Sequence, residues 1–255
     1  MKKLINIIFI LFILFSHTFA QNINTAQSNQ LPLIPKLDFI TTATNAQDVS
    51  VSIQILILLT ILALAPSILI MMTAFLRIVI VLSFLRRALG LQTTPPNQVI
   101  IGFALFLTFY VMSPVIDDIY NNAYKPYSQE QISFYEFLDR VQKPLKYFML
   151  KQTREKDLAL FIKLGKIPKP KGIEDLKMRV IIPAFIVSEL TRAFEIGFIL
   201  YIPFLIIDMV IASILMSMGM MMLPPIMISM PFKIVLFILV DGWHLLVKEL
   251  ILSFK

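Results

Sequence analysis

The sequence predicts an all-α protein of a membrane complex, built from two long kinked helical hairpins with a small helical polar domain between them. Of its 255 residues, 58% are hydrophobic and 15% are charged, whereas a soluble domain has roughly a quarter of its residues charged. The mean hydropathy is +0.81. Val49–Leu76 and Ala88–Ile116 contain no charged residue, and each exceeds the roughly 20 residues that a membrane-spanning helix needs.

Composition excludes several kinds of site. The sequence has no cysteine, which excludes disulfides and thiolate metal sites, and we expect neither a metal nor a cofactor. The net charge of +7 does not indicate nucleic-acid binding, because the lysines are scattered and form no basic-aromatic platform. Thirteen of the 23 Lys and Arg residues lie in Asp117–Val180 beside nine acids, as expected of a solvated, mildly basic domain.

The first 20 residues have the layout of a secretory signal peptide. Two lysines precede the apolar Leu4–Phe15, and Thr18-Phe19-Ala20 provides a small-x-small cleavage site. An uncleaved anchor helix is the alternative, although the apolar stretch is short for one. Cleavage would start the mature chain at Gln21, outside the cytoplasm. Residues 21–50, rich in Gln, Asn, Thr and Ser, are predicted to form a flexible polar tether.

Residues 51–116 predict the N-terminal helical hairpin. Val49–Leu76 forms the outgoing helix, which Pro66 is expected to kink, and Val99–Ile116 forms the returning helix. Between them lie a glycine and two prolines, which predict a turn, and three arginines flank it. Because positive residues favour the cytoplasmic side, the turn is expected to face the cytoplasm. The arginines and turn residues are Arg77, Arg86, Arg87, Gly90, Pro95 and Pro96.

Residues 117–180 are expected to form an extracytoplasmic helical domain. Their lysine excess is compatible with that side, because the positive-inside rule loses force for segments longer than about 60 residues. Glu130–Leu150 has apolar residues every three or four positions, which predicts a helix, and Pro144 is expected to end or kink it. Lys151–Leu164 predicts a second amphipathic helix, and Ile167–Gly172 a loop.

Residues 181–255 predict a C-terminal hairpin that carries more charges than two lipid-facing helices would. Glu189, Arg192 and Glu195 are three residues apart, so we expect an ion bridge along one helix face or to a neighbouring subunit. Asp208 and Lys233 flank the tip of the hairpin and are expected to pair across it. A proton relay or catalysis is the alternative role of these groups.

The tip of this hairpin is a methionine segment, Met216–Pro225, in which five of ten residues are methionine. Methionine is unbranched and polarizable, so such a cluster can repack around varied shapes. Gly219 and Pro225 predict that the preceding helix ends here and that a new one begins after the prolines. The segment is either filler of a helical core or a functional constriction, since interrupted backbone at membrane depth must be buried or line a cavity.

Six stretches carry a family resemblance: Arg77–Arg86, Gly90–Val99, Pro183–Leu190, Phe194–Phe198, Ile206–Val210 and Met218–Pro225. They resemble signature stretches of the FliP family, flagellar biosynthetic proteins of the type III export apparatus with injectisome counterparts in the SctR family. The resemblance covers Ile53 to Leu246, and the predicted signal peptide agrees with it.

The resemblance implies an export gate in the bacterial inner membrane, within the flagellar basal body. Five copies would assemble with FliQ and FliR around a pore for unfolded flagellar subunits, and much of the apolar sequence would be buried between subunits above the bilayer. The methionine segment would be the gasket of that pore. Its gate residues would be Met218, Met220, Met221 and Met222, with Gly219, Pro224 and Pro225 shaping the loop.

Two other classes of function use the charged residues. A proton-coupled channel or transporter would use Asp208, Asp241 and Lys233 within the membrane. An intramembrane aspartyl protease would use the two aspartates, but the sequence around Asp241 lacks the Gly-x-Gly-Asp motif of such enzymes. His244 is the one histidine of the predicted mature chain, so no Ser/His pair is available. We therefore expect no enzymatic activity, and the absence of a phosphate-loop motif implies that energy for transport comes from elsewhere.

Overall fold

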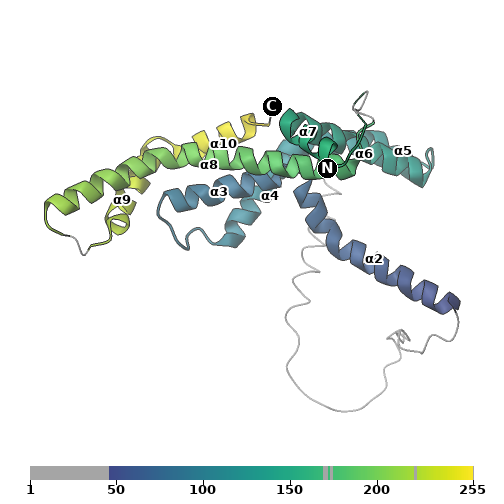
Figure 1. Cartoon of the computed structure of the whole chain (residues 1–255), viewed down its shortest axis with the longest axis horizontal. Helices are drawn as coiled ribbons and strands as arrows, with labels where there is room; N and C mark the ends of the chain where they lie inside the picture. Colours follow the sequence, from purple (N-terminus) through teal and green to yellow (C-terminus); the bar gives the residue numbers. More distant parts are fainter. Residues whose placement is uncertain (1–45, 169–171, 173–174, 221–222, 255) are drawn as a thin grey trace, which may run out of the picture. The chain divides into compact units, whose positions relative to one another are not determined.

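The computed structural model describes residues 46–168, 172, 175–220 and 223–254, and the regular structure in these ranges is entirely helical (Figure 1). This confirms the predicted all-α fold class. The chain divides into two compact units, residues 1–56 and 57–255, and the first is described only from Ala46 onward. The predicted signal peptide, most of the predicted tether, Met221 and Met222 lie outside the described residues.

The described part of the chain contains ten helical elements. In chain order they are α2 (Ala46–Met71), α3 (Phe75–Ala88), α4 (Asn97–Ile119), the π-helical turn η1 (Tyr120–Tyr124), α5 (Lys125–Ser128), α6 (Phe134–Gln152), α7 (Glu155–Leu164), α8 (Met178–Ser217), α9 (Pro225–Leu239) and α10 (Gly242–Leu252).

The outgoing arm of the N-terminal hairpin is two helices, so the prediction of one helix over Val49–Leu76 is wrong. Helix α2 continues through Pro66 and ends at Met71, and α3 begins at Phe75. Thr73 explains the break, because its hydroxyl donates to the Ile70 carbonyl at 2.9 Å and accepts the Phe75 N–H at 3.4 Å. A side chain that bonds the backbone in this way competes with helical hydrogen bonds.

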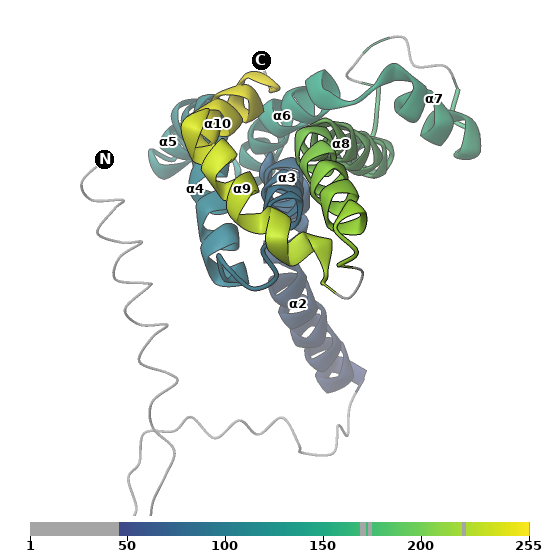
Figure 2. The same cartoon turned by 90° about the vertical axis from the view of Figure 1, so that its left-hand side faces the viewer.

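Helix α3 ends at a glycine and turns back into α4. Gly90 has φ of +79°. Its backbone N–H donates to the carbonyl of Arg87 at 3.0 Å, and the N–H of Leu91 donates to the carbonyl of Arg86 at 3.1 Å. This pair of bonds is the Schellman motif, which satisfies the last carbonyls of a helix. Helix α4 then returns along α3, which lies between α4 and α8 (Figure 2).

Helix α6 continues through Pro144 to Gln152, so that proline does not end the helix. The helix is amphipathic and packs against α4 and α8, and tertiary packing of an apolar face supplies most of the stability of helices in proteins. Ser133 caps its first turn by accepting the Glu136 N–H at 3.3 Å. The second helix of this region, α7, begins four residues later than predicted, at Glu155.

Helix α8 is the central packing partner of the fold. It runs for 40 residues through two prolines, Pro183 and Pro203, which makes it about 60 Å long, and it packs against α3, α6, α7 and α9. Asn97–Ser128 and Met178–Ser217 are long and apolar enough to cross a membrane, by length and composition. Only 28% and 11% of their most apolar windows are buried, whereas the core helix of a soluble protein would be mostly covered.

The core lies where α3 meets α8. Ile78, Val81 and Leu85 of α3 and Ile181 and Phe185 of α8 are all 2% exposed or less. Further along the same contact, α8 approaches α3 so closely that a Cβ atom at Gly197 would lie 2.6 Å from the ring of Phe84. Glycine at this position is therefore a packing requirement of the α3–α8 contact.

We predict that Gly197→Ala destabilises the protein. Alanine improves helix propensity by up to about 1 kcal/mol, but overpacking a close contact costs about 1–3 kcal/mol. The ring of Phe84 or the α8 backbone would have to shift to make room for the added Cβ atom. Thermal unfolding of the detergent-purified protein measures the effect. Gly102→Ala on α4 is the control, because nothing lies within 4 Å of its Cβ position; a Gly197→Ala variant as stable as this control would contradict the packing argument.

Candidate functional site

The backbone of the methionine segment turns sharply where α8 ends. Gly219 has φ of +76°, and the N–H groups of Gly219 and Met220 donate to the carbonyls of Met216 and Leu215 at 3.1 and 3.0 Å. This is a second Schellman motif, and only glycine adopts its positive φ without strain. Pro225 opens α9 at a position where the missing N–H costs nothing. The predicted end of one helix and start of the next are thus confirmed.

The methionines at the start of this segment are not part of the core of the chain. Met216, Met218 and Met220 are 62%, 65% and 38% exposed, whereas Met149 and Met112 in the core are 0% and 3% exposed. The described gate candidates, Met218 and Met220, are therefore exposed on this chain. Filling of a core within this one chain does not account for them.

Behind the methionine segment, an ion pair joins α8, α9 and α3. Lys233 Nζ of α9 lies 2.6 Å from Asp208 Oδ2 of α8 and donates to the carbonyl of Ala88, the last residue of α3, at 3.1 Å. Asp208 Oδ1 accepts the hydroxyl of Ser229. The side chains of Lys233 and Asp208 are 2% and 20% exposed. The structure thus brings the two residues together across the hairpin, and the lysine also neutralises a helix C-terminus.

Glu189, Arg192 and Glu195 have their described partners on other elements. Glu195 accepts from Arg154 at 3.4 Å, and Arg192 donates to the Gln152 side-chain oxygen at 3.3 Å. Glu189 pairs with Arg77 of α3, and both side chains are completely buried. Along α8 the three residues therefore run from Glu189, which is completely buried, to Glu195, whose side chain is 62% exposed.

Arg77 is the residue that sequence reasoning placed wrongly. It was expected beside the cytoplasmic turn, yet it is fully buried in α3 and cannot contribute to the charge of that turn. A signal existed, because Val81, Leu85 and Ala88 follow it at helical spacing on the buried face of α3. Of the arginines assigned to the turn, Arg86 does lie there and donates to the Pro95 carbonyl and to Asn97 Oδ1 at 3.1 and 2.7 Å.

All hydrogen-bonding directions of the Arg77 guanidinium are used. Two of its N–H groups donate to the two carboxylate oxygens of Glu189, and a third donates to Gln152 Oε1 at 3.0 Å. The remaining two donate to the carbonyl and hydroxyl of Ser253 at 2.7 and 3.0 Å. Phe254 covers the guanidinium plane, with its ring centre 3.9 Å from Cζ. We call these five residues the Arg77 cluster. It joins α3, α6, α8 and the residues that follow α10.

A third network docks α7 onto α8. Asp157 accepts from Arg154 Nε at 2.7 Å and from the Ser188 hydroxyl at 2.6 Å, and the same hydroxyl accepts the Arg154 N–H at 3.0 Å. Burial by itself would raise the pKa of Asp157, but the hydrogen bonds from Arg154 and Ser188 outweigh it and hold the pKa below its usual value. The carboxyl group is therefore a charged structural acceptor and not an acid.

The charged groups of these three networks are paired. Within the described ranges, no buried side-chain nitrogen or oxygen is without a hydrogen-bond partner. No group of three His, Asp or Glu residues suited to a metal occurs in the same part of the chain. Asp241 lies exposed in the turn before α10, with φ of +50°, while both oxygens of Asp208 are occupied. This geometry does not resemble an aspartyl dyad.

Comparison with known proteins gives one consistent family. The sequence profile of the FliP family matches residues 58–250. Flagellar biosynthetic protein FliP of Bacillus subtilis is 55% identical over 212 residues, which cover 83% of this chain and 96% of that protein. The protein of the same name from Pectobacterium carotovorum is 57% identical, over 82% of this chain and 81% of its own length. That of Aquifex aeolicus is 56% identical over 80% and 86%.

We predict that Glu189→Ala strongly destabilises the protein. The change strands the buried guanidinium of Arg77, and loss of one partner of a buried pair costs about 3–5 kcal/mol. The control is Asp139→Ala, which breaks the pair of Asp139 with Lys143, 2.8 Å apart and more than half exposed; such pairs contribute about 0.3–0.5 kcal/mol. Equal unfolding temperatures of the two variants in detergent would contradict the structural role of the Arg77 cluster.

We further predict that Lys233→Met is partly rescued by Asp208→Asn. The single change leaves the Asp208 carboxylate beside an apolar side chain, and the second change removes that charge. The double variant should unfold at a higher temperature than Lys233→Met alone, because the two residues interact directly. Additive losses of stability would show that the two side chains do not depend on each other.

Proposed function

Because the chain belongs to the FliP family, we propose that it is a core subunit of the flagellar type III protein export gate. In this proposal five copies surround a pore, together with FliQ and FliR, and unfolded flagellar subunits pass through it. The protein resides in the bacterial inner membrane, in the flagellar basal body. The turn with Arg86 and Arg87 faces the cytoplasm, and residues 117–180 lie outside it.

The observation that carries the gate role is the exposure of the methionine segment at a break between two helices. A helix end fixed by a Schellman motif, followed by exposed methionines and a double proline, presents soft side chains from a defined position. Exposed apolar side chains at the tip of a hairpin favour a partner surface or a pore over a solvated loop. Copies of the same segment around one axis would bring Met220, Met221 and Met222 together.

The sealing mechanism follows from the chemistry of the thioether. Five copies of three methionines would place fifteen flexible, apolar side chains at the pore centre, and such a hydrophobic constriction excludes water and ions. The same side chains can change rotamer around a passing polypeptide. Recognition of a particular sequence is unnecessary, because every stretch of the exported chain must pass.

The ion pairs supply the rigid part of this gate. Asp208, Ser229 and Lys233 hold α8 and α9 together behind the segment and tie both to the end of α3. The Arg77 cluster holds the other half of α8 against α3 and α6. The methionines can therefore repack while the helices that carry them stay in place. On this argument Glu189, Arg192, Glu195, Asp208 and Lys233 act in subunit architecture and assembly.

The rival function is a proton-coupled channel or transporter that uses Asp208, Asp241 and Lys233. The structure favours it less, because the Asp208 oxygens are bonded to Lys233 and Ser229 and because Asp241 lies exposed in a separate turn. Proton flux through the purified protein in vesicles, without any other export component, would support this rival. The structural pairing of the carboxylates likewise gives no support to an enzymatic role.

We predict that replacing Met220, Met221 and Met222 by Ala makes assembled complexes leak ions or small solutes at normal oligomer yield. Shorter side chains widen the proposed constriction, while Gly219 and the two prolines still shape the loop. Export need not be lost, because a wider ring still admits an extended polypeptide. Membrane conductance and oligomer yield are measured in the same cells.

Met149→Ala is the matched control for this experiment. Met149 is completely buried in α6, and truncation of a buried methionine costs about 2–5 kcal/mol. The control should lower the yield without causing a leak. If the triple variant behaves in the same way, the methionines of the segment are core filler of the assembly and the gasket proposal fails.

A further inference from the structure

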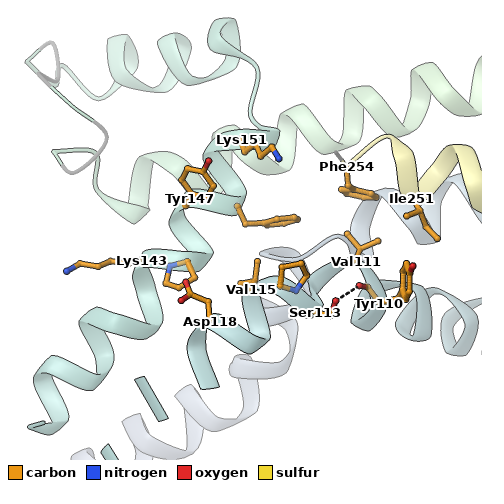
Figure 3. A pocket seen from close by; sticks show the side chains of 13 residues that line it. Tyr110, Val111, Ser113, Val115, Asp118, Lys143, Tyr147, Lys151, Ile251 and Phe254 are labelled. Atoms are coloured by element: carbon orange, nitrogen blue, oxygen red, sulfur yellow. Dashed lines mark hydrogen bonds between the residues drawn. The ribbon is translucent and has the colours of Figure 1, made fainter. Parts of the chain in front are cut away.

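The surface along α8 changes from charged to uncharged toward the methionine segment. Beside the first half of α8, against which α6 packs, a cavity of about 720 Å³ between α4, α6 and the end of α10 is lined in part by Asp118, Lys143 and Lys151 (Figure 3). From Ile196 to Phe232, by contrast, the sequence contains a single charged residue, Asp208, which is paired with the buried lysine of α9. A polypeptide that moves along the second half of α8 therefore meets no unpaired fixed charge on this helix.

The exposed side of the second half of α8 has two chemically different flanks. The methionine flank carries unbranched or small side chains and the β-branched flank carries stiff ones; they consist of Met209, Ser213 and Met216, and of Ile206, Val210 and Ile214. Spacings of three or four residues keep the members of each flank on one side of the helix. The apolar members are all 48% to 62% exposed, so the rest of the described chain covers neither flank.

The two flanks suit two different kinds of contact. Valine and isoleucine have essentially one χ1 rotamer in a helix, so the β-branched flank offers a fixed surface for permanent packing. Methionine has three rotatable bonds and adapts to irregular shapes, so the methionine flank suits a contact that changes. The hydroxyl of Ser213 donates to the carbonyl of Met209 at 2.9 Å, and its proton is therefore not available to hold a passing chain.

The other arm of the hairpin does not continue the methionine surface. Beyond Met230, α9 contains neither methionine nor serine, and its exposed side chains there include Phe232, Val235 and Leu239. Helix α8 is therefore the arm that extends soft side chains away from the methionine segment.

We infer that Met209 and Met216 line the passage of the exported polypeptide beyond the methionine segment, while the β-branched flank packs against a second copy of the chain. This inference rests on the proposed export gate and adds a second soft section to it. From Met209 to the end of α8 at Ser217 the helix rises about 12 Å, which an extended polypeptide covers with about four residues. A small side chain that leaves a gap at one section is then followed by a different side chain at the other, so the two sections do not open together.

Photo-cross-linking in cells tests the inference on the full chain with its assembled partners. A diazirine amino acid replaces Met209, Met216 or Val210 in separate variants, and an exported flagellar subunit fused to a stably folded domain stalls in the gate. Positions 209 and 216 should cross-link to the stalled subunit, with loss of the adduct when that subunit is absent. Position 210 should cross-link to a second copy of the chain. The same amino acid in place of Met222 reports on the proposed gate itself.

The position of the adducts separates failure of this inference from failure of the proposed function. Adducts of the stalled subunit at Met222, but neither at Met209 nor at Met216, would overturn the inference and leave the proposed gate intact. Lipid adducts at Met209, or adducts of the stalled subunit at Val210, would show that the two flanks are assigned wrongly. Absence of the subunit adduct at Met222 as well would contradict the proposed gate.

Membrane conductance tests whether the second section also seals. Met209→Ala, added to the variant with Ala at Met220, Met221 and Met222, should raise the leak per assembled complex above that of the triple variant. Val210→Ala in the same background is the control and should leave the leak per assembled complex unchanged. Equal leaks with and without Met209→Ala would overturn the sealing role of the methionine flank.

Discussion

Arg77 holds a full positive charge in a place that water does not reach, and the surrounding helices are arranged to satisfy it. A buried guanidinium is tolerated only when its five N–H donors have acceptors. Glu189, Gln152 and Ser253 supply these from α8, from α6 and from beyond α10. Segments 75, 112 and 176 residues away in sequence are thereby fixed against α3. Loss of Glu189 would leave an unpaired charge in the core, and loss of Gln152 or Ser253 would leave buried N–H donors of Arg77 without an acceptor.

Helix α8 carries this constraint to the methionine segment. The Arg77 cluster holds it at Glu189, the Asp208–Lys233 pair holds it again further along, and the helix ends at Ser217. From Glu189 to Ser217 the helix spans about 42 Å. Because the helix is held at two points, its last turn has a defined position relative to α3 and α6. The rigid contacts and the exposed methionines are thus separated along one helix, which suits the proposed seal.

The methionines of this chain have two distinct structural roles. Met149 and Met112 fill core positions, where an unbranched side chain fits irregular space. Met216 and Met218 are exposed at the hairpin tip, where the proposed gate would use the same flexibility. Each environment follows from burial and polarity and not from residue type alone.

The sequence by itself determined those features that depend on neighbouring residues. The all-α class, the returning helix of the first hairpin and the helix end at Gly219 follow from local physics, since apolar runs, positive φ at glycine and the missing proline N–H act within a few residues. Tertiary structure decided the partners of the charges. The break after Met71 depends on a Thr73 side chain that could equally have pointed outward. Arg77 pairs with Glu189 because packing brings together two residues that are 112 positions apart in the chain. A contact over such a separation produces no periodic pattern in the sequence.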